Sequence, residues 1–390
     1  MYRPGQRRVT RILCCKKVCA EHALRGDVMN YNDEKKYVGN RDQLFQIKKV
    51  KLQEGKARGV TMLEVANRSG MQFDVNADRG MDISFLSFNG ENFGYISPCG
   101  VAAPEYFDDQ KLGFLKSFTA GFLTTCGLKI AGAPCEYEGK AYGLHGNVSH
   151  IPAKEFRYEL VETDGSPYIE IQGSMQDAEI FQDKLTLKRN IRCGYREKEF
   201  TITDRVTNEG FKKARHMILY HCNIGYPILS PASEVYIPSA KVTPRTEHAK
   251  IGLKEWYKTQ QADPDYEEMC YYHKLIPDGN NHGHAAVYNP ELNLGIEMEI
   301  DLAALDHFVQ WKMMGAGEYV MGLEPANATI DGIEDAIKNG SMKYLEPGES
   351  AEYRITFRIL EGREAFENIK IKLNDEIENN RKENENNKEQ

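Results

Sequence analysis

The sequence lacks several patterns that would assign it to a familiar class. Its 390 residues contain no uninterrupted run of 18 apolar residues, which excludes an ordinary membrane-spanning helix. There is no Cys-x-x-Cys pair of the kind that binds zinc. A Walker loop, a Gly-x-Gly-x-x-Gly fingerprint after a strand and a Gly-x-Ser-x-Gly elbow are also missing. The sequence therefore shows no signature of a membrane partner, a bound metal or a nucleotide cofactor.

The chain also has fewer basic residues than acidic ones. The chain has 50 Lys and Arg residues against 58 Asp and Glu residues, a formal net charge of −8. Proteins that bind nucleic acids neutralise phosphates with Lys and Arg, so this balance argues against a nucleic-acid partner. The nine cysteines are scattered rather than paired. Most of them are expected to be small core residues in a reducing cytoplasm.

The first 28 residues differ from the rest of the sequence. They contain seven basic residues and two acidic ones, and their apolar stretches are too short or too broken by charge for a signal peptide. Met29 follows directly. We expect residues 1–35 to be a flexible extension or a wrongly assigned start.

Short apolar or alternating segments dominate the sequence from about residue 59. Each is bounded by Gly, Pro, Asn or Asp, as β-strands are. They span residues 60–65, 71–75, 82–86, 156–161, 168–173, 185–191, 199–206, 216–222, 285–288, 295–300, 308–312, 319–323 and 351–360. Little helical periodicity separates them, which favours an all-β sandwich over alternating strands and helices.

The remaining elements are few. One helical turn is expected within residues 105–110, and a short helix at 333–338 is closed by Asn339-Gly340. No linker or internal repeat divides the chain, so we expect one β domain over residues 36–362. A C-terminal helix is expected over residues 363–377, because Phe366, Ile369 and Leu373 have helical spacing. Residues 378–390 are rich in Asn, Glu and Lys and are expected to be disordered.

Glu324 is a candidate general base. It ends the apolar segment 319–323 and precedes Pro325, which is expected to stop strand pairing and hold Glu324 extended. A carboxylate at the end of a buried strand is partly desolvated, which raises its proton affinity. The alternative is a strand-end Glu that faces solvent.

His221 is a candidate acid–base residue because its strand, 217–222, is apolar on both faces and ends in a turn that contains Asn223. An imidazole can hold or release a proton near neutral pH, and clefts open at the rims of sheets. The alternative is a hydrogen-bonded core histidine.

His145 lies in a glycine-rich loop at residues 143–146, where the backbone can approach another surface closely. Arg79 follows a strand and precedes a glycine, so its guanidinium could bind sugar hydroxyls or a carboxylate. Arg79 and Asp82 could instead pair with each other. Trp311 alternates with Val309 in its strand and could either pack against the apolar face of a sugar or fill the core.

The order of these motifs resembles the aldose 1-epimerase (galactose mutarotase-like) superfamily, in particular its divergent DUF4432-type branch. The resemblance runs from about Lys36 to Arg358. It depends on segments 78–83, 124–128, 143–146, 219–227 and 322–327, together with Ser149 and the Pro152-Ala153 pair.

The resemblance implies a β-supersandwich that interconverts the anomers of a sugar without a metal or cofactor. In it, His221 is the acid that protonates the ring oxygen, and Glu324 is the base that takes the proton from the anomeric hydroxyl. His145 binds the sugar near the ring oxygen. Further substrate contacts are expected from Arg79, Asp82, Asn223, Trp311 and Asn327.

Part of the family pattern is missing from this chain. The acidic residue that grips two sugar hydroxyls has no clear counterpart, and Asp278 and His284 are weak candidates. The sequence therefore leaves three functions open: a mutarotase for free sugars, a mutarotase for sugar acids or sugar phosphates, and a sugar-binding sandwich without catalysis. In each case the partner is a small carbohydrate, and the protein is expected to be a cytoplasmic monomer or homodimer.

Overall fold

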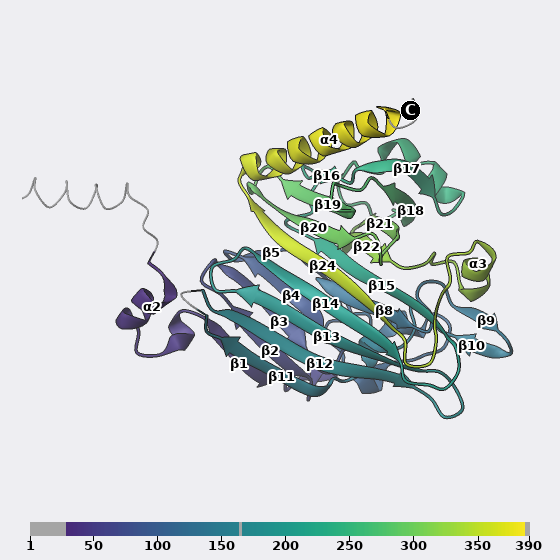
Figure 1. The fold of residues 1–390 in the computed structure, drawn as a ribbon, viewed down its shortest axis with the longest axis horizontal. Coiled ribbons are helices and arrows are strands. Elements are labelled where there is room, and N and C mark those ends of the chain that lie inside the picture. The colour runs from purple at the N-terminus through teal and green to yellow at the C-terminus, as the bar shows by residue number, and fades with distance from the viewer. Residues whose placement is uncertain (1–28, 164–165, 387–390) are drawn as a thin grey trace, which may run out of the picture.

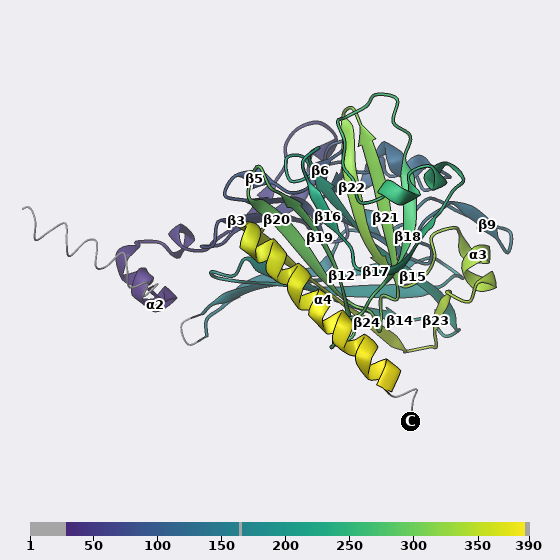
Figure 2. The ribbon, with the colours of Figure 1, turned by 90° about the horizontal axis from the view of Figure 1, so that it is seen from above.

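The fold was analysed in a computed structural model that describes residues 29–163 and 166–386. Two large antiparallel sheets lie face to face (Figures 1 and 2). The larger sheet consists of β1 (Gln46–Lys51), β2 (Thr61–Ala66), β3 (Met71–Asn76), β4 (Asp82–Phe88), β5 (Glu91–Asn92), β8 (Leu123–Leu128), β15 (Ala214–Gly225), β17 (Ser239–Pro244), β18 (Met269–Leu275), β21 (His307–Gly315), β22 (Glu318–Ala326) and β23 (Lys343–Leu345). Its main order is β1-β2-β3-β4-β8-β15-β22-β21-β18-β17.

The second sheet has the strand order β11-β12-β13-β14-β24-β20-β19-β16. These strands are β11 (Lys154–Val161), β12 (Tyr168–Ala178), β13 (Lys184–Gly194), β14 (Glu199–Asn208), β16 (Glu234–Tyr236), β19 (His282–Asn289), β20 (Leu294–Asp301) and β24 (Ser350–Glu361). Two short ribbons complete the strands: β6 (Tyr95–Ile96) with β7 (Ala120–Gly121), and β9 (Cys135–Tyr137) with β10 (Lys140–Tyr142).

The core lies between the two sheets. Residues Met71, Phe73 and Val75 alternate along β3 and are buried, as period-two patterning requires. Phe73 stacks on Phe200 of β14 with ring centroids 5.3 Å apart, which joins the two sheets through aromatic packing. The predicted all-β fold is confirmed, and each predicted strand is present, with ends that differ by up to five residues. Strand β15 does not end before Asn223 but continues to Gly225.

Helices occupy the margins of the sandwich. They are α2 (Tyr31–Glu34), α3 (Ile333–Lys338) and α4 (Arg363–Asn386), with short 3₁₀ turns between strands. Helix α4 lies along the second sheet (Figure 1), where Phe366 stacks on Tyr288 at 4.9 Å. Within the described ranges, no helix combines the length and the apolar character that crossing a membrane requires.

The structure corrects both predicted ends of the domain. Tyr31 and Glu34 lie in the predicted extension but are buried, and Glu34 accepts hydrogen bonds from Tyr195 and Arg196. At the other end, α4 continues past residue 377 to Asn386, since the Glu, Lys and Arg of this segment are good helix formers. Residues 1–28 and 387–390 lie outside the described residues.

A third correction concerns Pro325. Strand β22 does not end at Glu324 but continues to Ala326, and Pro325 lies opposite Phe308 of β21. On the other side, pairing with β15 is interrupted between Leu323 and Ala326. Proline lacks a backbone N–H, so the ladder is lost toward one neighbouring strand only.

Candidate active site

A cavity of about 350 Å³ lies over the central strands of the larger sheet. Strands β15, β22, β21 and β18 are neighbours in this sheet, and they supply His221, Glu324, Trp311 and Cys270 respectively. Loops supply the rest of the wall, including the 3₁₀ turn η5 (Gly113–Lys116) and His145. The structure thus brings together His145, His221, Trp311 and Glu324, which lie far apart in the sequence.

The register of β15 and β22 places His221 opposite Glu324. Leu219 pairs with Ala326 and Cys222 with Leu323. Between these two pairs, His221 therefore lies opposite Glu324. Directly opposite residues in an antiparallel pair project from the same face of the sheet. The His221 Nε2 atom lies 3.3 Å from Glu324 Oε1. The two side chains are therefore in contact, and Glu324 Oε1 and His221 Nδ1 have no hydrogen-bond partner among the described residues.

Burial sets the protonation of both partners. The residue exposures of His221 and Glu324 are 5% and 2%. Desolvation lowers the pKa of His221 to about 4 and raises the pKa of Glu324 to about 8. Near neutral pH the pair therefore holds one proton, mainly on the carboxyl group. The alternative of a solvent-facing Glu324 is excluded.

Gly322 makes room for the Glu324 carboxyl group. A Cβ atom at Gly322 would lie 2.3 Å from Glu324 Oε1 and 3.0 Å from Trp311 Cβ. Glu324 and Gly322 are two residues apart on β22 and share a face, and Trp311 lies directly opposite Gly322 on β21. The glycine in the 322–327 motif is thus required by the packing of the site itself.

His145 is held by backbone contacts between two loops. Its N–H donates to the carbonyl of Gly132 at 2.9 Å, and its own carbonyl accepts from the N–H of Gly127 at 2.9 Å. The N–H of Gly132 also donates to His145 Nδ1 at 3.2 Å. Nδ1 must therefore be unprotonated, which leaves the ring proton on Nε2. Burial also holds the pKa of His145 well below its usual range, so the ring is a neutral hydrogen-bond donor.

Aromatic rings surround His221. The His221 ring centroid lies 5.3 Å from Trp311, 5.3 Å from Phe118 and 5.5 Å from His145, all in edge-on arrangements. Phe114 lies 5.1 Å from His145. These rings border the acid–base pair and offer apolar faces to a ligand.

Two charged residues of the cavity, Arg245 and Glu268, were not found from the sequence. Arg245 follows β17, and its Nε donates to Asp331 at 2.7 Å. Glu268 precedes β18 and accepts a hydrogen bond from Trp311 Nε1 at 2.7 Å. Neither β17 nor β18 was among the predicted strands. The sequence therefore did not indicate that Arg245 and Glu268 lie at the ends of adjacent strands.

The structure places Arg79 away from the cavity, which corrects its predicted role. The guanidinium is buried and donates to the carbonyls of Ser149, Ala102 and Ser117 at 2.7, 2.7 and 3.1 Å. It also contacts His150 Nε2 at 2.7 Å. Four of its five N–H groups are used within the protein, so Arg79 joins the loops that form the cavity wall and does not itself line the cavity.

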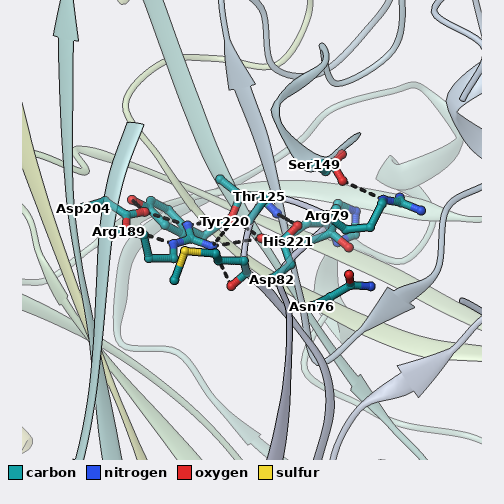
Figure 3. Close-up of polar contacts among 12 residues, drawn as sticks. Asn76, Arg79, Asp82, Thr125, Ser149, Arg189, Asp204, Tyr220 and His221 are labelled. Atoms are coloured by element: carbon teal, nitrogen blue, oxygen red, sulfur yellow. Dashed lines mark hydrogen bonds and ion pairs between the residues drawn. The ribbon is translucent and has the colours of Figure 1, made fainter. Parts of the chain in front are cut away.

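Asp82 is likewise a structural residue. Its carboxylate accepts from the Thr125 hydroxyl and N–H at 2.6 and 3.0 Å, and from Arg189 at 3.0 Å. Arg189 of β13, on the second sheet, is fully buried and forms a two-point contact with Asp204 of the neighbouring strand β14 at 2.9 and 2.6 Å. Figure 3 shows Arg189 linked to both carboxylates. Asp82 therefore ties the two sheets together, and the Arg79–Asp82 pair considered from the sequence is replaced by an Asp82–Arg189 pair.

Asn223 and Asn327 also lie outside the cavity lining. The Asn223 amide donates to the carbonyls of Ala120 and His221 at 3.2 and 2.9 Å. Asn327 accepts from the Ile218 N–H at 2.8 Å, just beyond the last residue of β22. Both amides are used to fix β15 against its neighbours, which positions His221 indirectly.

The weak candidates Asp278 and His284 form a separate buried cluster. His284 contacts Asp278 Oδ2 at 3.1 Å and Glu297 Oε1 at 2.9 Å, on the second sheet. Neither residue lines the cavity. Among the residues that the structure describes, no group of three or more His, Cys, Asp or Glu side chains is arranged to hold a metal ion.

Comparisons with known proteins agree with this arrangement. A family model described as a domain of unknown function, DUF4432, matches residues 57–359. The chain belongs to the DUF4432 family. This span contains both members of the acid–base pair and His145, so the cavity lies within the part that defines this DUF4432 domain. No curated protein sequence matches the chain.

Solved structures show the same architecture as this DUF4432 protein. A candidate aldose 1-epimerase from Klebsiella pneumoniae is 26% identical with a TM-score of 0.82, covering 87% of this chain and 91% of that chain. A galactose mutarotase-like protein from Clostridium acetobutylicum is 14% identical, with a TM-score of 0.59 and coverages of 81% and 99%. A galactose 1-epimerase from Lactobacillus acidophilus is 12% identical, with a TM-score of 0.52 and coverages of 81% and 99%. The last two share the fold alone. The fold is therefore galactose mutarotase-like.

Proposed function

We propose that this protein is a carbohydrate mutarotase, an isomerase that interconverts the anomers of an aldose. The single observation that supports this most is the His221–Glu324 pair, two buried acid–base groups 3.3 Å apart in an aromatic-walled cavity. Opening a sugar ring requires one proton to leave the anomeric hydroxyl and one to reach the ring oxygen. A base and an acid on the same face of the sheet can do both.

In the proposed reaction, the ionised Glu324 takes the proton from the O1 hydroxyl while protonated His221 gives a proton to the ring oxygen. The electrons of the O1–H bond form the C1=O1 carbonyl, and the C1–O bond to the ring oxygen breaks. Rotation about C1–C2 then exposes the other face of the carbonyl. Ring closure returns both protons, so the enzyme ends as it began.

The resting pair is one proton transfer away from this working state. It holds a single proton, and moving that proton from Glu324 to His221, against the difference between their pKa values, produces the base and the acid together. The neutral ring of His145 can donate its Nε2–H to a sugar oxygen beside His221. Arg245 and Glu268 are positioned to bind hydroxyl groups, as a donor and an acceptor respectively.

The charges favour a neutral sugar over a sugar phosphate or sugar acid. Arg245 is the one Lys or Arg residue among the described residues that line the cavity, and Asp331 already pairs with it. Glu268 and Glu324 line the same cavity. An anionic substrate would face one partly neutralised cation and at least one carboxylate, which is unfavourable in a buried site.

Anomer exchange on a panel of free aldoses, followed by NMR exchange spectroscopy or polarimetry, tests the proposal. Glu324→Gln should lower the catalysed rate by roughly 10²–10⁴-fold, the usual range for loss of a general base. Because the pKa of Glu324 is near 8, glutamine mimics its protonated form and the fold should survive. Glu267→Gln, at an exposed neighbouring carboxylate, is the matched control. Equal rates for wild type and Glu324→Gln on every sugar would contradict catalysis and leave a sugar-binding protein.

A further inference from the structure

We propose that the active cavity is the inner half of a longer cleft, and that its outer half binds a second sugar ring. This inference rests on the proposed mutarotase function. It assigns the substrate to a class: the reducing end of a disaccharide or longer oligosaccharide, with the free anomeric carbon in the inner half.

The two halves share a wall. A second cavity of about 390 Å³ lies beside the active cavity, and both are lined by Leu115, Phe118, Glu268 and Trp311. The active cavity, of about 350 Å³, has room for a single sugar ring and some water. A ligand larger than one ring must therefore extend beyond it, and the shared wall leads to the second cavity.

The outer cavity also lies on the solvent side. His221 and Glu324, at the inner end, are buried. The outer cavity is lined by Pro98 and Glu318, which are exposed, and it meets the active cavity at Leu115 and Glu268, which are exposed as well. A sugar whose anomeric carbon reaches His221 would thus direct its far end toward the outer cavity and then toward solvent.

The lining of the outer cavity suits an uncharged sugar ring. Its apolar surfaces come from Tyr95, Pro98, Cys99 and Met313 together with the shared residues. Such surfaces pack against the C–H face of a sugar. Polar groups at its margin, Glu268, Glu318 and Ser97, can accept hydrogen bonds from hydroxyl groups.

The charge of the outer cavity is unfavourable for a phosphate or carboxylate group in place of a second sugar ring. None of the described residues that line the outer cavity is Lys, Arg or His, whereas two are glutamates. A phosphate or carboxylate substituent would meet only negative charge there. An alkyl or aryl substituent would find apolar contacts, but it would form no hydrogen bond with Glu268 or Glu318.

The experiment compares anomer exchange of glucose with that of maltose, cellobiose and lactose, and of 6-O-benzylglucose. The expected result is a kcat/KM at least about tenfold higher for one of the disaccharides than for glucose, which is about 1.4 kcal/mol of extra transition-state binding. A higher kcat/KM for 6-O-benzylglucose than for any disaccharide would overturn the assignment to a second sugar. Equal values for glucose and the disaccharides would overturn the outer site.

Met313→Trp tests the location, since Met313 lines the outer cavity and is absent from the lining of the inner one. It should abolish the disaccharide advantage and change glucose exchange by less than about twofold. Cys99→Phe should do the same, since Cys99 also lines the outer cavity and not the inner one. Ile180→Trp, at an exposed position outside both cavities, is the control.

Failure of the proposed function would be recognised separately. If no sugar is turned over, calorimetric titration with glucose and maltose decides the further inference by itself. Maltose binding at least about tenfold tighter than glucose binding, and reduced to the glucose level by Met313→Trp, would support the outer site in a protein without catalysis. Indistinguishable binding of the two sugars would overturn it.

Discussion

His221 and Glu324 lie opposite each other on adjacent antiparallel strands, with Nε2 and Oε1 3.3 Å apart. Their strands are more than 90 residues apart in the sequence, and Pro325 interrupts the ladder beside them. The pair is buried and holds one proton near neutral pH because desolvation shifts the two pKa values in opposite directions. Several consequences of this arrangement can be measured.

The pH dependence of kcat/KM should be bell-shaped, with its maximum between about pH 4 and about pH 8. Below about pH 4 His221 becomes protonated while Glu324 keeps its proton, so the pair holds two protons and no base remains. Above about pH 8 Glu324 loses the last proton of the pair, so no acid remains. Anomer exchange measured by NMR, corrected for the uncatalysed rate at each pH, provides the test. A rate that keeps rising to pH 10 would show that another group supplies the acid.

Gly322→Ala should disable the site with little effect on the fold. The added Cβ would lie 2.3 Å from Glu324 Oε1, so the carboxyl group must move away from His221. A displacement of about 1 Å can cost on the order of 100-fold in rate. We expect kcat to fall by roughly 10- to 100-fold, as for other misplaced catalytic groups. The midpoint of urea-induced unfolding should shift only slightly. Gly39→Ala, where a Cβ meets nothing within 4 Å, is the control.

Arg79→Met should destabilise the protein rather than remove a substrate contact. It leaves the carbonyls of Ala102, Ser117 and Ser149 without their buried donor. The expected loss in the free energy of unfolding is about 3–5 kcal/mol, typical of a broken buried ionic or charged hydrogen-bond group. Arg157→Met, which removes an exposed contact with Gln172, should cost less than about 1 kcal/mol. A fully stable Arg79→Met protein with impaired sugar binding would restore the binding role predicted from the sequence.

His284 should make a pH-dependent contribution to stability. Desolvation lowers its pKa, but hydrogen bonds to Glu297 and Asp278 outweigh this and leave the pKa raised. The folded protein therefore holds this proton more tightly than the unfolded chain. Its stabilising effect is fully present below about pH 6.5, the pKa of an ordinary His, and is lost as the pH rises through the raised value.

His284→Gln should accordingly reduce the free energy of unfolding more at pH 6 than at pH 9, as measured by urea titration at each pH. The surface residue His248, which contacts Glu267, provides the control as His248→Gln. An equal loss at both pH values would mean that His284 acts through packing alone.

The parts of the site that could be predicted are those with strong local patterns. His221 and Glu324 lie on apolar strands that alternate or end in turns, and the glycines around His145 mark a tight loop. Arg245 and Glu268 were missed because they lie beside β17 and β18, strands whose polar and mixed residues gave no clear alternation. Conversely, Arg79 and Asp82 have the appearance of ligand-binding residues in sequence, yet both use their hydrogen-bonding groups within the protein.

The sequence by itself determined the β-sandwich class and the strands with clear alternation, because alternation of apolar residues and turn-forming residues acts over only a few positions. It named His221 and Glu324 as candidates, but their joint role was implied by the resemblance of their motifs to a known family and not by local patterning. The tertiary structure decided which polar side chains face the cavity. A buried arginine or aspartate must find partners, and whether those partners are other parts of the chain or a ligand depends on strand register and loop packing across more than a hundred residues. Asp82 illustrates this: its partner is Arg189, on the opposite sheet.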